Sequence, residues 1–226
     1  MKKFYFFPVI VTLLACGPVS QGQSTGPNLL GAKGTFSAPF ITVNTKATSC
    51  TVQGTQTYNP VGNIGNALNG CNAVGSSLPC SGYNYVYKSG GLQPEFTYTI
   101  IKNVGDLNGG NCIKGDWRGQ DHTGDGGYFM AVNGAPNTTK SPIFYQIKSI
   151  PVCPGTQYEF SAYVLNILPA SSPYATDTSR PNISFKVISG KDTTVVGSSG
   201  PIPYTATPTW IKVGGTFTPS DTTTSV

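Results

Sequence analysis

Residues 120–133, Gln120-Asp-His-Thr-Gly-Asp-Gly-Gly-Tyr-Phe-Met-Ala-Val-Asn133, are the most informative part of the sequence for the fold. Its first half is a polar, glycine-rich loop that carries Asp121, Asp125 and His122, the single histidine of the chain. Its second half, residues 128–133, is a short apolar run between two glycines, a pattern that predicts a buried β-strand. Loops positioned by a rigid strand often carry functional side chains. The stretch is therefore both a candidate site and a candidate structural element.

Short strands are predicted on both sides of this stretch. Polar and apolar side chains alternate along residues 83–88 and 95–102, which is the period of a half-buried β-strand. Similar patterns predict further strands over residues 28–37, 40–43, 143–148, 156–166, 182–188, 194–196 and 210–213, and around Phe217. No part of the chain has a convincing helical period, and prolines interrupt every candidate helix. Roughly eight to ten short strands at this spacing predict an all-β fold, a β-sandwich or jelly roll.

The composition is typical of an exported β protein. Of the 226 residues, 38% are hydrophobic and only 10% are charged, so the surface is covered by hydroxyls and amides rather than by charge. The length suits one β domain, and an aromatic content of 11% argues against disorder. The formal net charge of +5 comes from scattered residues and not from a basic run. We therefore expect neither a nucleic-acid partner nor an anionic membrane surface as partner.

The N-terminus predicts export. Two lysines precede an apolar stretch at residues 4–15, which is too short to span a membrane and suits the core of a signal peptide. Two processing routes remain open. The run Leu13-Leu-Ala-Cys16 matches a bacterial lipobox, in which Cys16 is lipidated, whereas the small residues of Ser20-Gln-Gly22 allow ordinary cleavage after them. Either route predicts a secreted or outer-surface protein, and the first predicts a lipid anchor at Cys16.

The cysteines predict disulfides. Either processing route leaves five of the six cysteines in the body of the protein, and their spacings match no zinc-binding pattern. In exported proteins, disulfides are the default state of such cysteines. Cys71 and Cys80 enclose a small loop and form the first predicted pair, and Cys50 with Cys112 is the second. The odd count leaves Cys153 over, with a partner expected beyond residue 226.

A series of motifs along the chain resembles a known extracellular module. The motifs are Asn28-Leu-Leu, Gly34-Thr-Phe-Ser37, Asp121-His-Thr-Gly-x-Gly-Gly-Tyr-x-Met-x-Val-Asn133, Phe144-Tyr-Gln146, Cys153-Pro-Gly-Thr-x-Tyr-x-Phe-Ser-Ala162, Arg180-Pro-Asn-Ile-Ser-Phe185 and Trp210. In this order they resemble the galactose-binding-like jelly roll of exported proteins from Bacteroidetes-type bacteria, which is related to carbohydrate-binding modules. The resemblance covers about residues 28–226, is best from Asp121 onward, and implies a jelly-roll β-sandwich.

The predicted domain plan has three parts. Residues 1–22 form the signal peptide, residues 23–27 a polar spacer and residues 28–226 the jelly roll. A loop insertion at about 44–82, rich in asparagine, glycine and hydroxyl residues, is expected to be held by disulfides. The sequence stops at Thr224-Ser225-Val226, where the pattern predicts the opening of a strand. We therefore expect a C-terminal truncation and further domains of the same polypeptide.

Calcium is the metal that both the residues and the resemblance suggest. Asp121 and Asp125, with the nearby Asp116, offer carboxylate oxygens in a glycine-rich loop, which Ca²⁺ favours. The alternative is that these aspartates accept hydrogen bonds from their own turn. The resemblance implies a structural calcium whose ligands include an acidic residue on the first strand, where this sequence has Ser37, and an aspartate on the last strand.

No catalytic constellation is predicted. His122 would need a nucleophile and an orienting acid in space, and its neighbour Asp121 supplies neither by sequence adjacency. Glycoside hydrolysis needs two carboxyl groups that flank the bond. The chain has only two glutamates, and the second, Glu159, alternates with apolar residues on a predicted strand and should face solvent. We therefore expect no enzymatic activity.

Carbohydrate binding is the predicted function. Sugar sites combine flat aromatic faces with amides or charges, although the same aromatics are ordinary core residues of a sandwich. The candidate ligand-binding residues are Trp117, Tyr128, Tyr163, Asn166, Tyr174 and Arg180, whereas Trp210 is expected to be in the core. The hypothesis is a non-catalytic recognition or adhesion module that binds a glycan or another surface ligand. The alternative is a purely structural module of a larger surface protein with no small ligand.

Overall fold

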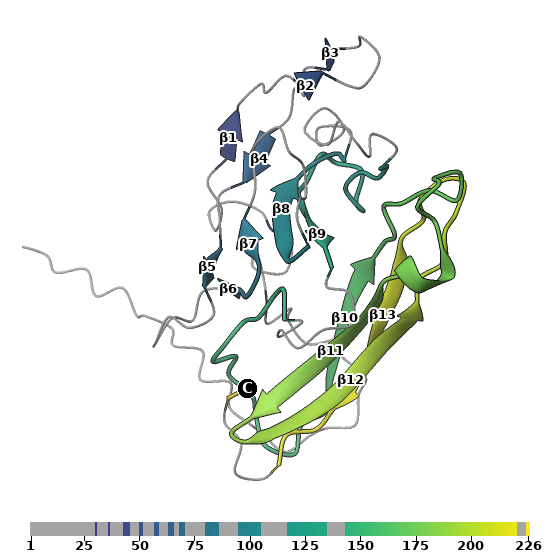
Figure 1. Cartoon of the computed structure of the whole chain (residues 1–226). Coiled ribbons are helices and arrows are strands. Elements are labelled where there is room, and N and C mark those ends of the chain that lie inside the picture. The colour runs from purple at the N-terminus through teal and green to yellow at the C-terminus, as the bar shows by residue number, and fades with distance from the viewer. Residues whose placement is uncertain are drawn as a thin grey trace, which may run out of the picture.

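The described part of this chain is a set of β-sheets. The structure is a computed structural model, and it describes residues 30, 36, 43–45, 50–51, 57–58, 63–65, 68–70, 80–85, 95–104, 117–134, 143–220 and 225–226. Within these residues there are thirteen strands, one 3₁₀ turn and no α-helix, which confirms the all-β prediction (Figure 1). The predicted signal peptide and spacer lie outside the described residues.

The strands differ strongly in length along the chain. The first seven have two or three residues each: β1 (Val43–Thr45), β2 (Cys50–Thr51), β3 (Thr57–Tyr58), β4 (Asn63–Gly65), β5 (Asn69–Gly70), β6 (Cys80–Ser81) and β7 (Asn84–Tyr85). The last six are longer: β8 (Thr97–Ile101), β9 (Phe129–Asn133), β10 (Tyr158–Val164), β11 (Asn182–Ser189), β12 (Asp192–Pro201) and β13 (Ile211–Phe217). The 3₁₀ turn, Asp177–Ser179, lies between β10 and β11.

A three-stranded sheet of order β7-β8-β9 lies at the centre of the chain. β9 pairs antiparallel with β8, from Thr97 opposite Asn133 to Ile101 opposite Phe129, and it confirms the apolar strand predicted at residues 128–133. Every residue of β8 is buried, including Thr97 and Thr99. β8 confirms the strand predicted over residues 95–102, and it is buried on both faces because it lies between two partner strands and has apolar layers on each face.

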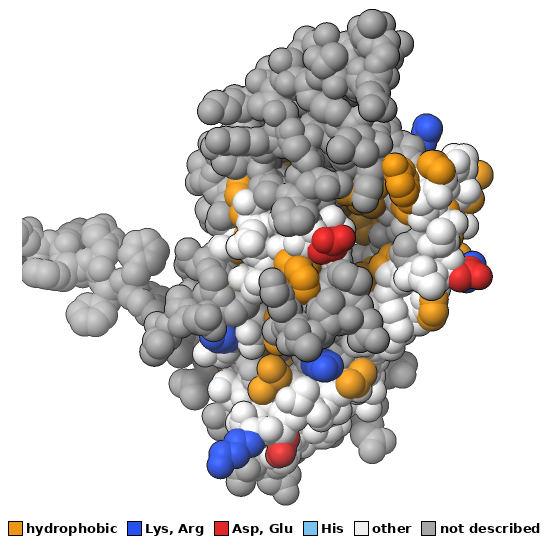
Figure 2. Space-filling model, in the orientation of Figure 1, with side chains coloured by type: hydrophobic (Ala, Val, Ile, Leu, Met, Phe, Trp, Pro, Cys, Tyr) orange, Lys and Arg blue, Asp and Glu red, His pale blue; other side chains and the backbone are white. Residues whose placement is uncertain are grey.

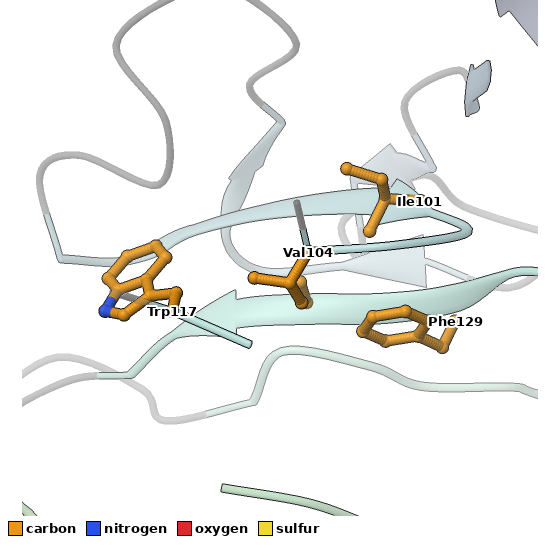
Figure 3. Packing of buried hydrophobic residues seen from close by; sticks show 5 residues of the cluster. Ile101, Val104, Trp117 and Phe129 are labelled. Atoms are coloured by element: carbon orange, nitrogen blue, oxygen red, sulfur yellow. The ribbon is translucent and has the colours of Figure 1, made fainter. Parts of the chain in front are cut away.

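Those two layers form the core around β8. On one face, Ile101 packs with Val104, Trp117, Phe129 and Ala131, and Figure 3 shows these side chains gathered beside β8 and β9. On the other face, Tyr98 and Ile100 pack with Leu68 and Tyr83. Burying a large apolar side chain stabilises a fold by about 1.5–3 kcal/mol. The two layers thus make β8 and β9 the rigid support for the loop that joins them.

Two antiparallel pairs build the C-terminal part. β10 pairs with β13 and β11 pairs with β12, and the pairs lie together at one side of Figure 1. The rings of Phe160 and Phe185 lie 5.0 Å apart, so side chains of β10 and β11 meet between the two pairs. Along β10, Glu159 and Tyr163 are exposed whereas the alternating residues are more buried, as the period of two predicted.

The surface of the described part carries little charge. Figure 2 shows a few charged side chains on one face, some with an opposite charge beside them, and no patch of one sign. Among the described residues no helix has the length and apolar character needed to cross a membrane.

Candidate functional site

The loop before β9 is built around two aspartates. The hydroxyl Oγ1 of Thr123 lies 2.5 Å from Asp121 Oδ2 and 2.6 Å from Asp125 Oδ1, and its one proton can serve only one of them at a time. The backbone N–H of Gly124 also donates to Asp121, and that of Gly127 donates to Asp125. The Thr123 hydroxyl, as the largest contribution, and the Gly127 N–H lower the pKa of Asp125. The loop is therefore a turn closed by its own carboxylates.

This arrangement fits turn formation better than a calcium cage. Ca²⁺ takes about 6–8 oxygen ligands. One oxygen of Asp121 and one of Asp125 are already engaged by donors of the loop, and Asp116 lies outside the described residues. In the described part of the chain, no three His, Cys, Asp or Glu side chains group as metal ligands would. Binding of Ca²⁺ by Asp121 and Asp125 stays a prediction.

The side chain of His122 points away from these hydrogen bonds and contacts two aromatic residues that are distant in the sequence. Its ring stacks on Tyr163 of β10, with centroids 3.6 Å apart and planes at 23°, and meets the ring of Trp210 edge-on at 5.8 Å. Trp210 immediately precedes β13, packs edge-on against Phe129 at 5.6 Å and donates its Nε1–H to the carbonyl of Gln120. These contacts of the His–Tyr–Trp cluster (His122, Tyr163, Trp210) fasten the loop onto both β9 and the β10–β13 pair.

A cleft of about 460 Å³ opens beside this cluster. Its described lining comes from four parts of the chain: Asn103, residues 118–122 with Gly124, Leu165, and residues 206–208 with Trp210. Backbone hydrogen bonds from Val104 to Gly119 and from Asp121 to Lys102 hold the first part against the end of β8. The cleft therefore has a fixed wall of backbone, an aromatic edge and polar side chains.

The charges in the lining are few. Asp121 is only 9% exposed, and its Oδ2 accepts bonds from the loop. Arg118 is exposed, and it makes no ion pair with any described carboxylate. His122, Asn103 and Gln120 add polar groups without a fixed charge. Arg118 is thus the accessible fixed charge of the cleft.

The structure separates the six predicted ligand-binding residues. Trp117 is 7% exposed and belongs to the core, so its ring offers no face to a ligand. Asn166 is buried, and its amide donates to Ile202 O and accepts from Leu168 N, so it has a structural role. Trp117 was expected in a polar loop and Asn166 at the outward-facing end of a strand, whereas the structure buries both side chains.

The other four predicted residues are not brought together. Tyr163 is 46% exposed and belongs to the His–Tyr–Trp cluster. Tyr128 packs against the second core layer with Lys102 over its ring, and burial raises the pKa of its phenol. Tyr174 is exposed and Arg180 pairs with Asp177 at 2.8 Å, and neither lines the cleft.

Sequence reasoning missed most of the cleft. Arg118, Gln120, Asn103 and residues 206–208 line it, yet none was predicted to bind a ligand. Trp210, expected in the core, does pack on Phe129 but also lines the cleft. A weak sign was present at Arg118, a cation in a glycine-rich loop beside a tryptophan. No local pattern marks residues 206–208, since their position depends on long-range folding.

No described group activates His122 for catalysis. Its ring contacts are with the two aromatic rings, and no described serine, cysteine or carboxylate hydrogen-bonds to it. Glu159 faces solvent, as predicted, and pairs with Lys212 at 3.2 Å.

The two cysteines whose side chains the structure describes, Cys80 and Cys153, are both disulfide-bonded. The prediction that Cys153 is a leftover thiol was therefore wrong, because an odd number of cysteines does not indicate which one is unpaired. Cys50, Cys71 and Cys112 have no described side chains, so the pairs Cys71–Cys80 and Cys50–Cys112 stay predictions, as does lipidation at Cys16, which lies outside the described residues.

No family model, no curated protein and no solved structure matches the chain.

Proposed function

We propose that this chain is a non-catalytic, exported recognition module that binds carbohydrate in the cleft beside the His–Tyr–Trp cluster. The observation that carries the proposal is the composition of that cleft: aromatic rings at its edge, amides and a guanidinium in its lining, and a volume of about 460 Å³. Ligand sites of this size typically combine apolar surface with a few placed polar groups.

The chemistry of a sugar suits such a lining. One face of a pyranose ring carries C–H groups that pack on an aromatic ring, while the hydroxyls at its rim need hydrogen-bond partners. Trp210 and His122 supply ring surface, and Asn103 and Gln120 supply side-chain amides, each with two donors and an acceptor. Tyr163 does not line the cleft but holds the His122 ring by stacking on it.

Support for a non-catalytic role comes from the same residues. Nucleophilic catalysis requires a base within hydrogen-bond reach of a nucleophile, and glycoside hydrolysis requires a pair of carboxyl groups across the bond. Among the lining residues that the structure describes, Asp121 is the single carboxylate, and it is bonded to its own loop. A binding role needs none of these groups.

The proposal includes the fold and the compartment. The fold is a jelly-roll β-sandwich of the galactose-binding-like type, which the paired antiparallel strands β10–β13 and β11–β12 support. Export follows from the apolar N-terminus, with either cleavage after residue 22 or a lipid anchor at Cys16. Further domains of the same polypeptide would use the module for surface attachment.

The first prediction tests binding at this cleft. The purified protein should be retarded in affinity electrophoresis by at least one polysaccharide of a panel of neutral and acidic polymers. His122→Ala and Tyr163→Ala should each weaken that binding about three- to tenfold, because an aromatic contact contributes about 0.5–1.5 kcal/mol. Tyr174→Ala is the matched control, since it removes another exposed tyrosine that does not line the cleft, and it should bind like the wild type.

Two results would contradict the proposal. Absence of retardation by every polymer would favour the structural module without a small ligand. A loss of binding in Tyr174→Ala as large as in His122→Ala would place the site elsewhere. Circular dichroism of each variant shows whether a loss of binding comes from unfolding instead.

A further inference from the structure

Arg118 is held by its backbone while its side chain stays accessible. Its N–H donates to the carbonyl of Ile167 at 2.8 Å, and the preceding residue, Trp117, is buried in the core. The following residue, Gly119, has φ of +145°, and a Cβ there would lie 2.9 Å from the side chain of Leu165. The backbone is therefore fixed on both sides of Arg118. Its exposed side chain begins at a defined point in the wall of the cleft.

The guanidinium of Arg118 has no anionic partner in the described chain. The two described ion pairs involve other cations: Arg180 pairs with Asp177, and Lys212 pairs with Glu159. Asp121 is the one carboxylate in the described part of the cleft lining, and it is almost fully buried and bonded to Thr123 and Gly124. An arginine offers five N–H donors in a planar fork that matches an anionic oxygen pair. The fork thus remains available to a ligand.

We infer that the cleft selects saccharides with an anionic substituent, a carboxylate or a sulfate ester, and that Arg118 binds that substituent. The inference rests on the proposed carbohydrate function of the same cleft. Hydrogen bonds between a guanidinium and an anion are roughly twice as strong as neutral ones, so the anion gains more from Arg118 than a hydroxyl would. Among the described residues of the lining Arg118 is the accessible cation, so this part of the cleft suits one negative group per bound sugar unit.

The aromatic edge gives this selection its geometry. Trp210 is fixed by its bond to Gln120 O and by the ring of Phe129, and His122 is fixed by the ring of Tyr163. A sugar ring packed on this edge would place its substituents toward the lining residues on either side. Arg118 then distinguishes an acidic sugar from its neutral counterpart, while the aromatic rings bind both.

The second prediction compares one polymer backbone with and without charge. The purified protein is titrated with polygalacturonate, with its fully methyl-esterified form, and with dextran sulfate against dextran. At least one acidic polymer should bind ten times or more tighter than its neutral counterpart. In Arg118→Gln that preference should fall to about threefold or less, since a charge-assisted hydrogen bond is lost. Lys191→Gln is the matched control: it removes one exposed positive charge at the β11–β12 turn and should keep the preference.

The outcomes separate the inference from the proposed function. A preference for polygalacturonate identifies a carboxylate, and one for dextran sulfate identifies a sulfate ester, and both support the inference. Equal binding of acidic and neutral polymers would overturn the inference and leave carbohydrate binding intact. An equal loss in Arg118→Gln and Lys191→Gln would also overturn it, because net charge alone would then explain the preference. Binding to none of these polymers, nor to the wider panel, would overturn both.

Discussion

Glycines of β12 and β13 set how closely these two strands approach each other. A Cβ on Gly215 would lie 1.9 Å from the carbonyl oxygen of Val196, and one on Gly197 would lie 3.0 Å from the backbone of Gly214. Real Cβ atoms do not approach backbone atoms that closely, and backbone cannot rotate away as a long side chain can. The close contact between the two antiparallel pairs therefore requires glycine, which has no side chain, at these positions.

The third prediction belongs to this residue scale. Gly215→Ala should lower the free energy of unfolding by roughly 2–3 kcal/mol, because the new methyl group overlaps a backbone oxygen and forces the strands apart. Gly134→Ala is the matched control, since a Cβ there meets nothing within 4 Å, and it should change stability by less than about 0.5 kcal/mol. Chemical denaturation of both variants measures the difference. Equal stabilities of Gly215→Ala and the wild type would show that the strands are not in close contact.

At the scale of elements, β8 is the strand on which the rest of the central sheet depends. The phenol oxygen of Tyr98 accepts a hydrogen bond from Leu68 N at 2.6 Å and donates to Leu68 O at 3.4 Å, which ties β8 to a segment thirty positions earlier. Burial is the main reason that the pKa of Tyr98 is raised. Its neighbour Thr99 is fully buried, and its hydroxyl has no hydrogen-bond partner among the described residues.

The fourth prediction is that substitutions at these two neighbours have opposite effects. Tyr98→Phe should destabilise the protein by about 1–3 kcal/mol, because it leaves the buried N–H and C=O of Leu68 without a partner. Thr99→Val should stabilise it by up to about 1 kcal/mol, because it replaces an unsatisfied hydroxyl with a methyl group of the same shape. Thermal unfolding monitored by circular dichroism measures both. A Thr99→Val protein less stable than the wild type would show that the Thr99 hydroxyl has a partner.

Element patterns in the sequence predicted the strands well and the cleft poorly. The apolar run at β9 and the alternation along β10 depend on neighbouring residues, so sequence alone placed them correctly. Burial of β8 on both faces depends on what packs over it, and Thr97 and Thr99 gave no sign of it. Trp117 was a ligand candidate as an aromatic residue in a polar loop, yet its indole completes the core layer of Figure 3. The cleft combines residues from 103 to 210, and no local period relates positions so far apart.

At the scale of the whole molecule, the candidate site lies where two parts of the fold meet. His122 comes from the loop before β9, whereas Tyr163 belongs to β10 and Trp210 precedes β13. The edge-on contact of Trp210 with Phe129 extends the core of the central sheet to the edge of the cleft. A ligand that packs on this cluster therefore contacts both parts, so binding should be sensitive to how they are joined.

The fifth prediction concerns the two tryptophans, of which one reports on the core and the other on the cleft. Trp117 is buried in the core, and Trp210 lines the cleft with its Nε1–H bonded to Gln120 O. In a ¹⁵N-labelled protein each indole gives one N–H resonance, and Trp117→Phe assigns them. A bound saccharide at the cleft alters the surroundings of one indole and leaves those of the other unchanged.

Binding in the cleft is tested by titrating this labelled protein with an oligosaccharide of the polymer that binds in electrophoresis. We expect the Trp210 indole resonance to shift in proportion to occupancy while the Trp117 resonance stays in place. Saturable binding that leaves the Trp210 resonance unmoved would contradict this expectation, because the ligand would then be held outside the cleft beside the His–Tyr–Trp cluster.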